Sequence, residues 1–455
     1  MQGSARDRLA HGRTIPGDII APQRRVGQSA QAGAQYGPPS GQYAFLLQAG
    51  ISAATLAIAE AEARQCGVSV HQVLLCAGLV SPTAYTSALA GQLGVPVAGW
   101  DAVFHPGMPG GTDDVNMEGV PAHLSGLTHR VLCAEKETPD VLRERLAGLK
   151  ARGSSVALST RFRLDAALDA HLQPVRLDHA VSGLARQQPA CSAAGPTWIW
   201  QVIAGAIAVG LLAGGFSVLP YATLVVVSGL IGLPFLCVTL LRVIALREVV
   251  ASPRKAMRRQ PPAAHILPQT LPHYTVMVPL FREVKVLPGL LQSLQAIVYP
   301  RAKLEILLVL EAADIETQAA VLGMRLPGNI RTVVVPDQAP RTKPKALNYA
   351  LQLARGEYVV VYDAEDRPEP DQLLRALTAF ERGPPELGCV QAQLNVYNPR
   401  ASWLTRQFTI EYSALFDAVL PALARLGLPV PLGGTFVGAR ASPVLRSTGL
   451  SRPAG

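Results

Sequence analysis

The sequence predicts an α/β protein in which a doubly wound, nucleotide-binding domain follows a transmembrane helical hairpin and a small N-terminal α/β module. Three observations support this prediction. Apolar strands alternate with helical segments after Tyr274, two long uncharged stretches lie near the middle of the chain, and helices and strands mix before them. At 455 residues the chain is long enough for two or three domains with cores of their own.

The composition is apolar and basic. Hydrophobic residues make up 49% of the chain and charged residues only 16%, and 41 Lys and Arg against 32 Asp and Glu give a net charge of +9. The basic residues are dispersed beside apolar segments rather than clustered with aromatic residues. A membrane therefore explains them better than nucleic acid, which we do not expect as a partner. The six cysteines lack C-x-x-C spacing, so we expect neither a zinc site nor a disulfide framework, in keeping with a reducing cytosol.

Residues 41–190 are predicted to form a compact α/β module. Ser52 is placed to cap a helix that runs to Gly67, and Ser81 is placed to cap a second helix that stops at Gly94. The stretches THRVLCAEKETPDVLRERLAGL and SSVALSTRFRLDAALDAHL each read as a short strand followed by an amphipathic helix.

A two-helix transmembrane hairpin is predicted at residues 198–246. The segments 198–217 and 222–241 carry no charge, and each supplies the roughly 20 apolar residues that a hydrocarbon core requires. Arginine and lysine residues flank the hairpin on both sides: Arg176, Arg186, Arg242, Arg247, Arg254, Lys255, Arg258 and Arg259. By the positive-inside rule we expect both soluble parts to be cytoplasmic.

Residues 272–435 alternate between strand and helix. TVMVPL, EILLVL, TVVVP and YVVVYD are apolar runs typical of parallel strands, and helical patterns lie between them at 285–297, 314–323 and 343–354. This order predicts a doubly wound sheet, whose ligands lie at the carboxyl ends of its strands.

Charged side chains gather at these predicted strand ends. EILLVL ends in Glu311, with Asp314 three residues later, and Lys343 and Lys345 open the helix that precedes YVVVYD. YVVVYD itself runs into three acids: Asp363, Glu365 and Asp366. An isolated D-x-[DE] is more often an acidic turn that caps a helix. Acids that face lysines at a helix N-terminus instead favour a diphosphate with Mg2+ or Mn2+, because hard carboxylate oxygens select these cations.

The run from Tyr274 to Thr435 resembles the catalytic domain of inverting family 2 glycosyltransferases, which have the GT-A fold of cellulose and hyaluronan synthases. RTKPKALNYAL resembles the family's Lys-Ala-x-Asn helix, YDAEDRPEPDQL its D-x-D motif, and VQAQLNVYNP the strand that floors the donor sugar. The resemblance implies that a cation bridging the UDP phosphates is held by the acidic set Asp363, Glu365 and Asp366. Glu311 stands where the family has a uracil-binding aspartate. The candidate donor-nucleotide residues are Glu311, Asp314, Lys343, Lys345, Asn348 and Gln391.

The N-terminal module resembles the corresponding module of type II secretion ATPases, which binds cyclic di-GMP in some members. The resemblance rests on VSVHQVLLCAGLVSPTAYTSALAGQLGVP, in which Gly78, Leu89 and Gln92 match the nucleotide-binding pattern. Ser69 stands at the arginine position and His71 at a glycine position. Losing the arginine removes the evident phosphate contact. We therefore do not expect cyclic di-GMP as a ligand, and an interaction or folding role is favoured.

A general base is not identified in the sequence. The family's Thr-Glu-Asp and Gln-x-x-Arg-Trp motifs do not occur, and Asp417 is placed in the middle of a helix, so no catalytic residue is assigned. Residues 436–455 show neither a strand nor a helix period, and they have a composition that a shifted reading frame of GC-rich DNA produces. They are expected to be irregular, in a truncated or frameshifted product. Residues 1–40 read as a disordered lead-in without a signal peptide.

The expected function is that of a membrane-anchored hexosyltransferase that uses a UDP-sugar. The order of module, hairpin and transferase domain resembles bacterial exopolysaccharide glycosyltransferases, so the expected acceptor is a sugar or polysaccharide. If the chain is truncated, its activity is in doubt. The alternative is a non-catalytic membrane adaptor or nucleotide sensor, in which the module docks a partner and the transferase domain is a remnant.

Overall fold

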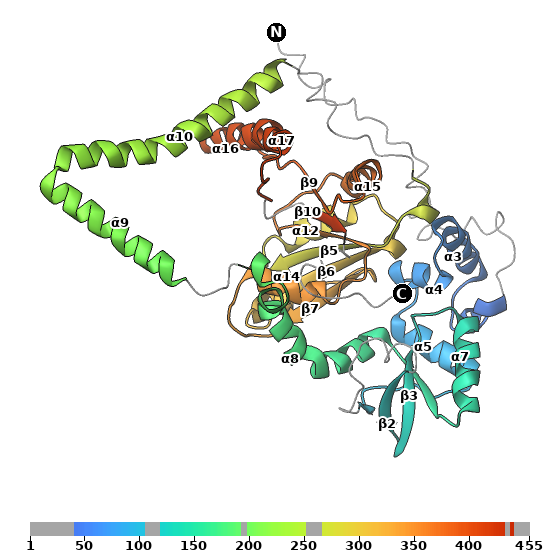
Figure 1. Ribbon diagram of the computed structural model, residues 1–455. Coiled ribbons are helices and arrows are strands. Elements are labelled where there is room, and N and C mark those ends of the chain that lie inside the picture. Colours follow the sequence, from blue (N-terminus) through green and yellow to red (C-terminus); the bar gives the residue numbers. More distant parts are fainter. Residues whose placement is uncertain (1–40, 105–118, 193–197, 252–265, 433–436, 441–455) are drawn as a thin grey trace, which may run out of the picture.

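The computed structural model describes residues 41–104, 119–192, 198–251, 266–432 and 437–440. The lead-in expected at residues 1–40 lies outside this part of the chain. An N-terminal α/β module, two long apolar helices and an α/β domain with a central sheet follow one another in sequence (Figure 1). This architecture confirms the α/β fold class that the sequence predicts.

The N-terminal module packs helices around a four-stranded sheet. Its sheet has the order β1-β2-β3-β4, in which only β3 and β4 are parallel. The strands are β1 (Val103–Phe104), β2 (Val120–Leu124), β3 (Leu127–Cys133) and β4 (Val156–Ser159). The helices are α2 (Phe45–Gln48), α3 (Ala53–Cys66), α4 (Val70–Cys76), α5 (Pro82–Leu93), α7 (Pro139–Ala151) and α8 (Arg161–Gln187). Short 3-10 turns cover Gly41–Tyr43 and Pro189–Cys191.

The helix ends predicted from serine and glycine are confirmed. The hydroxyl oxygens of Ser52 and Ser81 each accept a hydrogen bond of 3.1 Å from a backbone N–H in the first turn of α3 and α5. Both helices end at glycines in the left-handed region, with φ of 66° at Gly67 and 62° at Gly94. These caps are local in sequence, which is why the sequence alone predicts them.

His71 lies in the core of the module. The Tyr43 hydroxyl donates to its Nδ1 at 3.1 Å, and its Nε2–H donates to the carbonyl oxygen of Glu135 at 3.1 Å. The imidazole is also stacked on Tyr85. Burial lowers the pKa of His71 to about 4, although its bond to Glu135 opposes the shift.

We predict that His71 makes the module less stable in mild acid. Between pH 6.5 and about 4 the unfolded chain binds a proton that the folded chain excludes, so the free energy of unfolding falls with pH by up to about 3 kcal/mol. Thermal unfolding of the full chain from pH 7 to pH 4.5 measures this loss. His71→Gln is expected to flatten the profile, whereas the exposed control His171→Gln leaves it unchanged. Parallel profiles for wild type and His71→Gln would contradict the prediction.

Two long apolar helices follow the module. They are α9 (Ile199–Val218) and α10 (Pro220–Ala251), and only Leu219 separates them. Their apolar windows have mean hydropathies of 1.9 and 2.5, and no part of either window is buried in the protein. The two helices diverge from their short connection (Figure 1). Both are long enough to cross a bilayer.

The larger domain is built on a six-stranded sheet of order β7-β6-β5-β8-β10-β9. Its strands are β5 (Tyr274–Leu280), β6 (Leu304–Glu311), β7 (Ile330–Val335), β8 (Tyr358–Val361), β9 (Cys389–Gln391) and β10 (Val437–Arg440). Its helices are α12 (Leu287–Gln295), α13 (Ile315–Leu322), α14 (Lys343–Leu351), α15 (Gln372–Arg382), α16 (Trp403–Ser413), the π-helical turn η5 (Ala414–Val419) and α17 (Leu420–Arg425). Short 3-10 turns cover Pro268–Thr270 and Arg301–Lys303. The strands and helices predicted between Tyr274 and residue 361 are all present.

One prediction about the end of the chain is wrong. The irregular segment expected from residue 436 instead contributes Val437–Arg440 as β10, which pairs antiparallel with both β8 and β9. Four residues are too few for a strand period, and this strand depends on neighbours that are distant in sequence. The other residues of that segment lie outside the described part of the chain.

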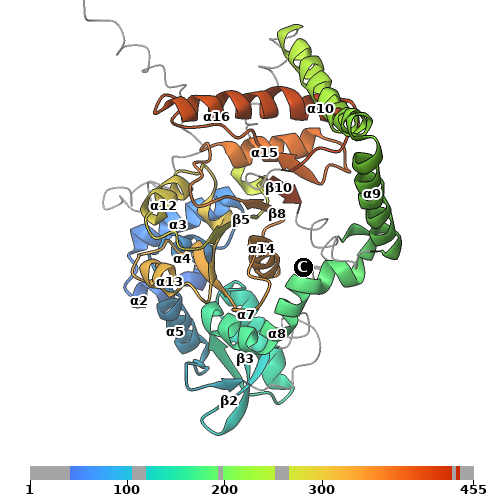
Figure 2. The same cartoon turned by 90° about the vertical axis from the view of Figure 1, so that its left-hand side faces the viewer.

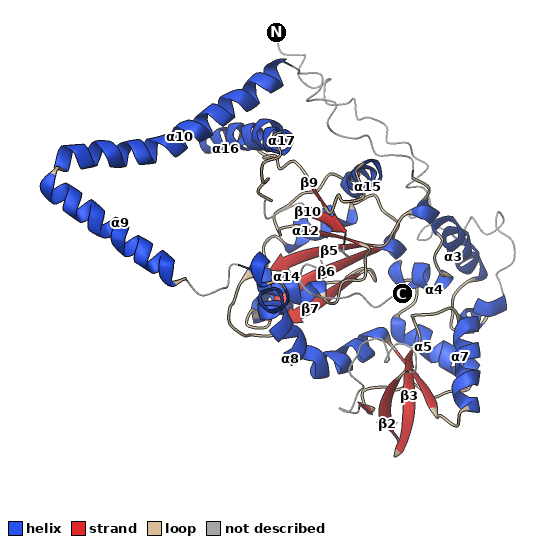
Figure 3. Cartoon of the chain, viewed as in Figure 1, coloured by secondary structure: helices blue, strands red, loops and turns tan. Residues whose placement is uncertain are grey.

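Helices cover both faces of this sheet (Figure 3). Helices α12, α13 and α15 pack on one face against Val276, Val278 and Leu308. Helix α14 packs on the other face, together with Leu177 and Ala180 of α8. The N-terminal module therefore supplies part of the core of the larger domain. The sequence did not indicate this, because the pattern of α8 reads only as an amphipathic helix.

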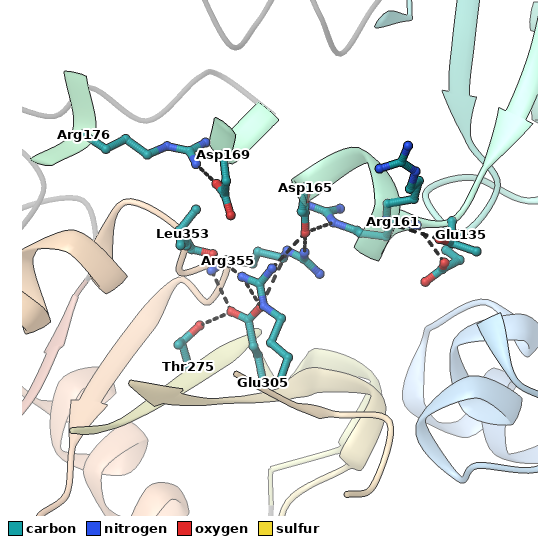
Figure 4. A network of polar contacts seen from close by, with 12 residues as sticks. Glu135, Arg161, Asp165, Asp169, Arg176, Thr275, Glu305, Leu353 and Arg355 are labelled. Atoms are coloured by element: carbon teal, nitrogen blue, oxygen red, sulfur yellow. Dashed lines mark hydrogen bonds and ion pairs between the residues drawn. The ribbon is translucent and has the colours of Figure 1, made fainter. Parts of the chain in front are cut away.

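A polar network joins α8 to the same sheet (Figure 4). The Asp165 carboxylate contacts the guanidinium groups of Arg331 at 2.9 Å and Arg355 at 3.1 Å. Glu305 contacts the same two arginines at 3.2 and 3.5 Å, and its Oε2 accepts from Thr275 Oγ1 at 2.9 Å. The four charged groups balance one another, so each depends on its neighbours for compensation.

We predict that Asp165→Ala weakens this junction. Two arginines lose a shared carboxylate, and the groups are less than half exposed, so the expected loss of stability is about 1–2 kcal/mol. Thermal unfolding of the full chain measures it. Asp178→Ala on the same helix removes a more exposed ion pair with Arg186 and is the matched control, with no measurable change in stability expected. Equal effects of the two substitutions would mean that the network does not join the two parts.

Candidate active site

The carboxyl ends of four strands meet at one edge of the large sheet. In the register, Leu280 of β5 pairs with Leu310 of β6, and Met277 of β5 pairs with Val361 of β8. Val437 of β10 pairs with both Val361 and Gln391, so the end of β9 lies level with the end of β8. The segments that follow β5, β6, β8 and β9 therefore border a common edge, as expected for a ligand site in such a sheet.

The acidic turn after β8 is fixed by its own side chain. The Asp363 N–H donates to Asp366 Oδ2 at 2.7 Å, and the Asp366 N–H donates to the Asp363 carbonyl oxygen at 3.1 Å. Ala364 between them is buried, whereas Asp363 is half-buried and Glu365 is exposed. Burial raises the pKa of Asp366 to about 6, with the charges of Asp363 and Glu365 adding to the shift. The turn thus uses the Asp366 carboxylate to hold its shape and leaves the carboxylates of Asp363 and Glu365 outside its own hydrogen bonds.

The predicted group of three metal-binding acids is therefore not assembled. In the part of the chain that the structure describes, no three His, Cys, Asp or Glu side chains are grouped closely enough to hold a metal ion. The reason is the bond from the Asp363 N–H to Asp366. Two carboxylates still fit Mg2+ or Mn2+, because these cations commonly bind one or two carboxylates and take their other ligands from substrate phosphates and water.

Glu283 adds negative charge at the same edge. It follows β5, and its pKa is raised by burial and by the negative charges of Glu365 and Asp363. Three carboxylates from two strand ends thus repel one another, which a bound cation would relieve. Glu283 is not among the residues nominated from the sequence. Its position three residues after the predicted strand TVMVPL is the signal that could have identified it.

The two candidate lysines have different surroundings. Lys343 is partly exposed, and its ammonium forms an ion pair with Asp363. Lys345 is only 2% exposed; its Nζ lies 3.4 Å from Glu311 Oε2 and donates to the Gln338 carbonyl oxygen at 3.1 Å. Lys343 is therefore accessible to a diphosphate, whereas Lys345 and Glu311 form a buried pair that ties the end of β6 to the start of α14.

Asp314 acts as a helix cap. Its carboxylate accepts from the backbone N–H of Thr317 at 3.2 Å and of Arg282 at 2.5 Å. Burial opposes ionisation, but these hydrogen bonds hold the pKa of Asp314 below its usual value. Arg282 has a φ of 60°, which is unusual for a residue other than glycine, and its bond to Asp314 compensates that strain.

Of the last two candidate donor residues, Asn348 has a partner within the protein and Gln391 has none among the described residues. Asn348 donates through Nδ2 to the carbonyl oxygen of Ala180 at 3.1 Å, so its amide holds α14 against α8. Gln391 lies at the carboxyl end of β9, and its Nε2 is buried with no hydrogen-bond partner among the described residues. A buried donor without a partner is costly, and a ligand oxygen is one way to satisfy it.

One further polar pair borders this region. Gln393 Nε2 donates to Asp417 Oδ1 at 3.0 Å, which connects the segment after β9 to the π-helical turn η5. Sequence reasoning placed Asp417 in the middle of a helix, as found, but gave no sign of the π-turn or of this bond. Single π-turns in α-helices are frequent near functional sites.

Comparison with known proteins identifies the larger domain. Residues 275–442 match the model of the family described as Glycosyl transferase family 2. Curated relatives named beta-monoglucosyldiacylglycerol synthase, from Trichormus variabilis and Nostoc sp., are each 25% identical over 176 residues, which is 38% of this chain and 36% of the relative. The probable glycosyltransferase YdaM of Bacillus subtilis is 27% identical over 143 residues, or 31% of this chain and 34% of the relative.

Solved structures of nucleotide-sugar enzymes are also similar in part. The mannosyltransferase PcManGT from Pyrobaculum calidifontis, in complex with GDP-Man and Mn2+, is 25% identical with a TM-score of 0.31, over 47% of this chain and 59% of that chain. S. aureus TarS 1–349 in complex with UDP-GlcNAc is 18% identical with a TM-score of 0.25, over 40% and 48% of the two chains.

The match covers one part of the chain. The aligned segments span about a third of the length of the curated relatives. Residues 275–442 match the family 2 glycosyltransferase model, and the mixed sheet with its helices confirms the GT-A-like fold expected for this part of the chain.

Proposed function

We propose that this chain is a membrane-anchored, inverting glycosyltransferase that takes its sugar from a UDP-sugar. The observation that carries the proposal is the acidic edge formed by Glu283, Asp363 and Glu365 within the family 2 domain. An acidic edge repels a sugar nucleotide unless a cation lies between them, so the arrangement favours metal-dependent binding of a diphosphate.

Asp363 and Glu365 are the residues that would hold Mg2+ or Mn2+, with Asp366 maintaining the turn that presents them. When bound, the cation would neutralise the diphosphate, which leaves as its bond to the anomeric carbon breaks and an acceptor hydroxyl oxygen bonds to that carbon. Lys343, which is paired with Asp363 and partly exposed, would donate to a phosphate oxygen of the bound donor. Gln391, whose buried Nε2 has no partner among the described residues, would donate to a hydroxyl of the donor sugar.

The candidate residues that bond within the protein hold together the elements around the site. Lys345 and Glu311 hold the start of α14 to the end of β6, and Asp314 holds the turn after β5. Asn348 holds α14 to α8. In this proposal these residues position the donor site, and their neighbours Lys343, Asp363 and Gln391 contact the donor.

We propose that α9 and α10 cross the bacterial inner membrane as a hairpin, with both soluble parts in the cytoplasm. The two windows are apolar and unburied, and arginines lie on both sides of the hairpin. Cytoplasmic placement gives the donor site access to soluble nucleotide-sugars. The acceptor proposed from the domain order is a growing exopolysaccharide. A second candidate is a membrane lipid, which the names of the two curated cyanobacterial relatives favour.

A transfer assay with the full chain in membrane vesicles tests the proposal. Vesicles are supplied with a radiolabelled UDP-sugar and Mn2+, and label is followed into polymer, into organic-phase lipid and into released UDP. UDP release that depends on Mn2+ and exceeds that of vesicles with Asp363→Asn protein supports transfer, and the labelled phase distinguishes the two acceptors. No release above the variant with any UDP-hexose would overturn the proposed activity.

A further inference from the structure

Helix α16 exposes an unusual amount of apolar surface. None of its residues is buried, and Trp403, Leu404, Phe408 and Ile410 are 71, 55, 45 and 64% exposed. Leu415 in the following turn is 39% exposed. A surface helix normally turns such side chains toward a core, and contiguous exposed apolar groups mark an interaction surface.

Helix α16 continues into η5 and α17, and it is this end of the long helix that meets α10 (Figure 2). Ala418 of η5 and Ala422 of α17 enclose Ala245 of α10. Small residues on both sides allow this close approach. Helix α16, with its exposed apolar residues, therefore extends from a contact with α10.

The contact on α10 lies at a specific depth. Twenty-five residues separate Ala245 from Pro220, where the helix begins, which corresponds to about 38 Å of helix. A hydrocarbon core is about 30 Å thick, so a spanning α10 places Ala245 just outside it, at the level of the lipid headgroups. Helix α16 is attached to α10 at this level.

The residue types on α16 suit that position. Tryptophan prefers the boundary between headgroups and acyl chains, because its ring is apolar and its N–H is polar. Arg242 and Arg247 on α10, with Arg400 and Arg406 at the start of α16, place four exposed cations around the apolar residues. Such cations are attracted to the anionic lipids of a cytoplasmic leaflet.

We propose that α16 rests on the cytoplasmic surface of the bilayer, with Trp403, Leu404, Phe408 and Ile410 inserted to the level of the glycerol groups. This inference rests on the proposed membrane insertion of α9 and α10. It adds a second, interfacial contact that fixes the orientation of the transferase domain. The Gln393–Asp417 bond then holds the segment after β9 close to the lipid surface, so the end of the sheet that bears Gln391 is near the membrane.

Lipid quenching of single tryptophans tests the proposal on the full chain. The protein is reconstituted into phosphatidylcholine–phosphatidylglycerol vesicles with phosphatidylcholine brominated near the glycerol end of its acyl chain. Three variants keep Trp403, Trp200 or Trp100 and carry Phe at the other tryptophans. Trp200, at the start of α9, reports insertion of the hairpin. Trp100 in the N-terminal module is 72% exposed, much like Trp403, and is the matched aqueous control.

The proposal predicts that brominated lipid quenches Trp403 and Trp200 by at least about twofold but leaves Trp100 unchanged. Trp403 that is quenched by aqueous acrylamide but not by brominated lipid, while Trp200 is quenched by lipid, would overturn the placement of α16 and leave the anchor intact. Trp403 shielded from both quenchers would overturn it in favour of a protein contact, such as a second copy. Lipid quenching of neither Trp403 nor Trp200 would overturn the membrane anchor and this inference together.

Discussion

Replacing Asp363 with asparagine is expected to weaken Mn2+-dependent binding of UDP by at least about 100-fold, equivalent to about 2.8 kcal/mol. The amide keeps the size of the side chain and can keep the turn, because the Asp363 backbone N–H, not its side chain, bonds to Asp366. What is lost is one of two carboxylates available to the cation and the partner of Lys343. Isothermal titration of UDP into the purified full chain, with Mn2+ and with EDTA, measures the effect.

Asp371→Asn is the matched control for this experiment. Asp371 follows the same acidic turn and is about as exposed as Asp363, at 23 against 24% of the side chain, but it pairs with Arg375 on α15. UDP affinity is expected to be unchanged in this variant. If Asp363→Asn and Asp371→Asn bind UDP as wild type does, the acidic turn is not the cation site.

Replacing Lys345 with methionine is expected to destabilise the transferase domain by about 3 kcal/mol. The side chain is almost fully buried, and removing it leaves Glu311 at 16% exposure without its cation. The Gln338 carbonyl oxygen also loses its donor. Thermal unfolding should therefore shift down by roughly 8 °C for a domain of this size.

Two further variants distinguish the loss of the cation beside Glu311 from the general effect of replacing a lysine in α14. Lys343→Met removes a lysine from the same helix turn whose ion pair is much more exposed, and a shift below roughly 2 °C is expected. The double variant Lys345→Met with Glu311→Gln removes the uncompensated carboxylate and should regain part of the loss. Equal shifts for Lys343→Met and Lys345→Met would mean that the buried pair contributes nothing special.

Local signals in the sequence predict much of the fold. Ser52, Gly67, Ser81 and Gly94 mark helix ends within a few residues, and the structure has them there. Val437–Arg440 could not be predicted in the same way, because a four-residue strand takes its conformation from β8 and β9. The packing of α8 on the large sheet is equally non-local, since Ala180 meets residues more than ninety positions later.

The candidate site was likewise predicted only in part, because some of its contacts are not local in sequence. The rule that ligands lie at the carboxyl ends of parallel strands predicts that Glu311 and Asp363 share one edge, and the family resemblance adds Gln391. It could not tell which side chains are used internally. Lys345 is buried and donates to the loop after β7. The carboxylates of Asp314 and Asp366 accept hydrogen bonds from the backbone N–H groups of Arg282 and Asp363. Each of these uses depends on a contact whose geometry only the folded chain defines.

A crystal structure of the full chain grown with UDP and Mn2+ tests the proposed cation site, because manganese gives an anomalous signal that locates it. We expect one strong peak at the sheet edge, within about 2.3 Å of carboxylate oxygens of Asp363 or Glu365 and of a UDP phosphate oxygen. UDP bound elsewhere, or bound at this edge with no manganese between it and the acidic turn, would contradict the proposed site.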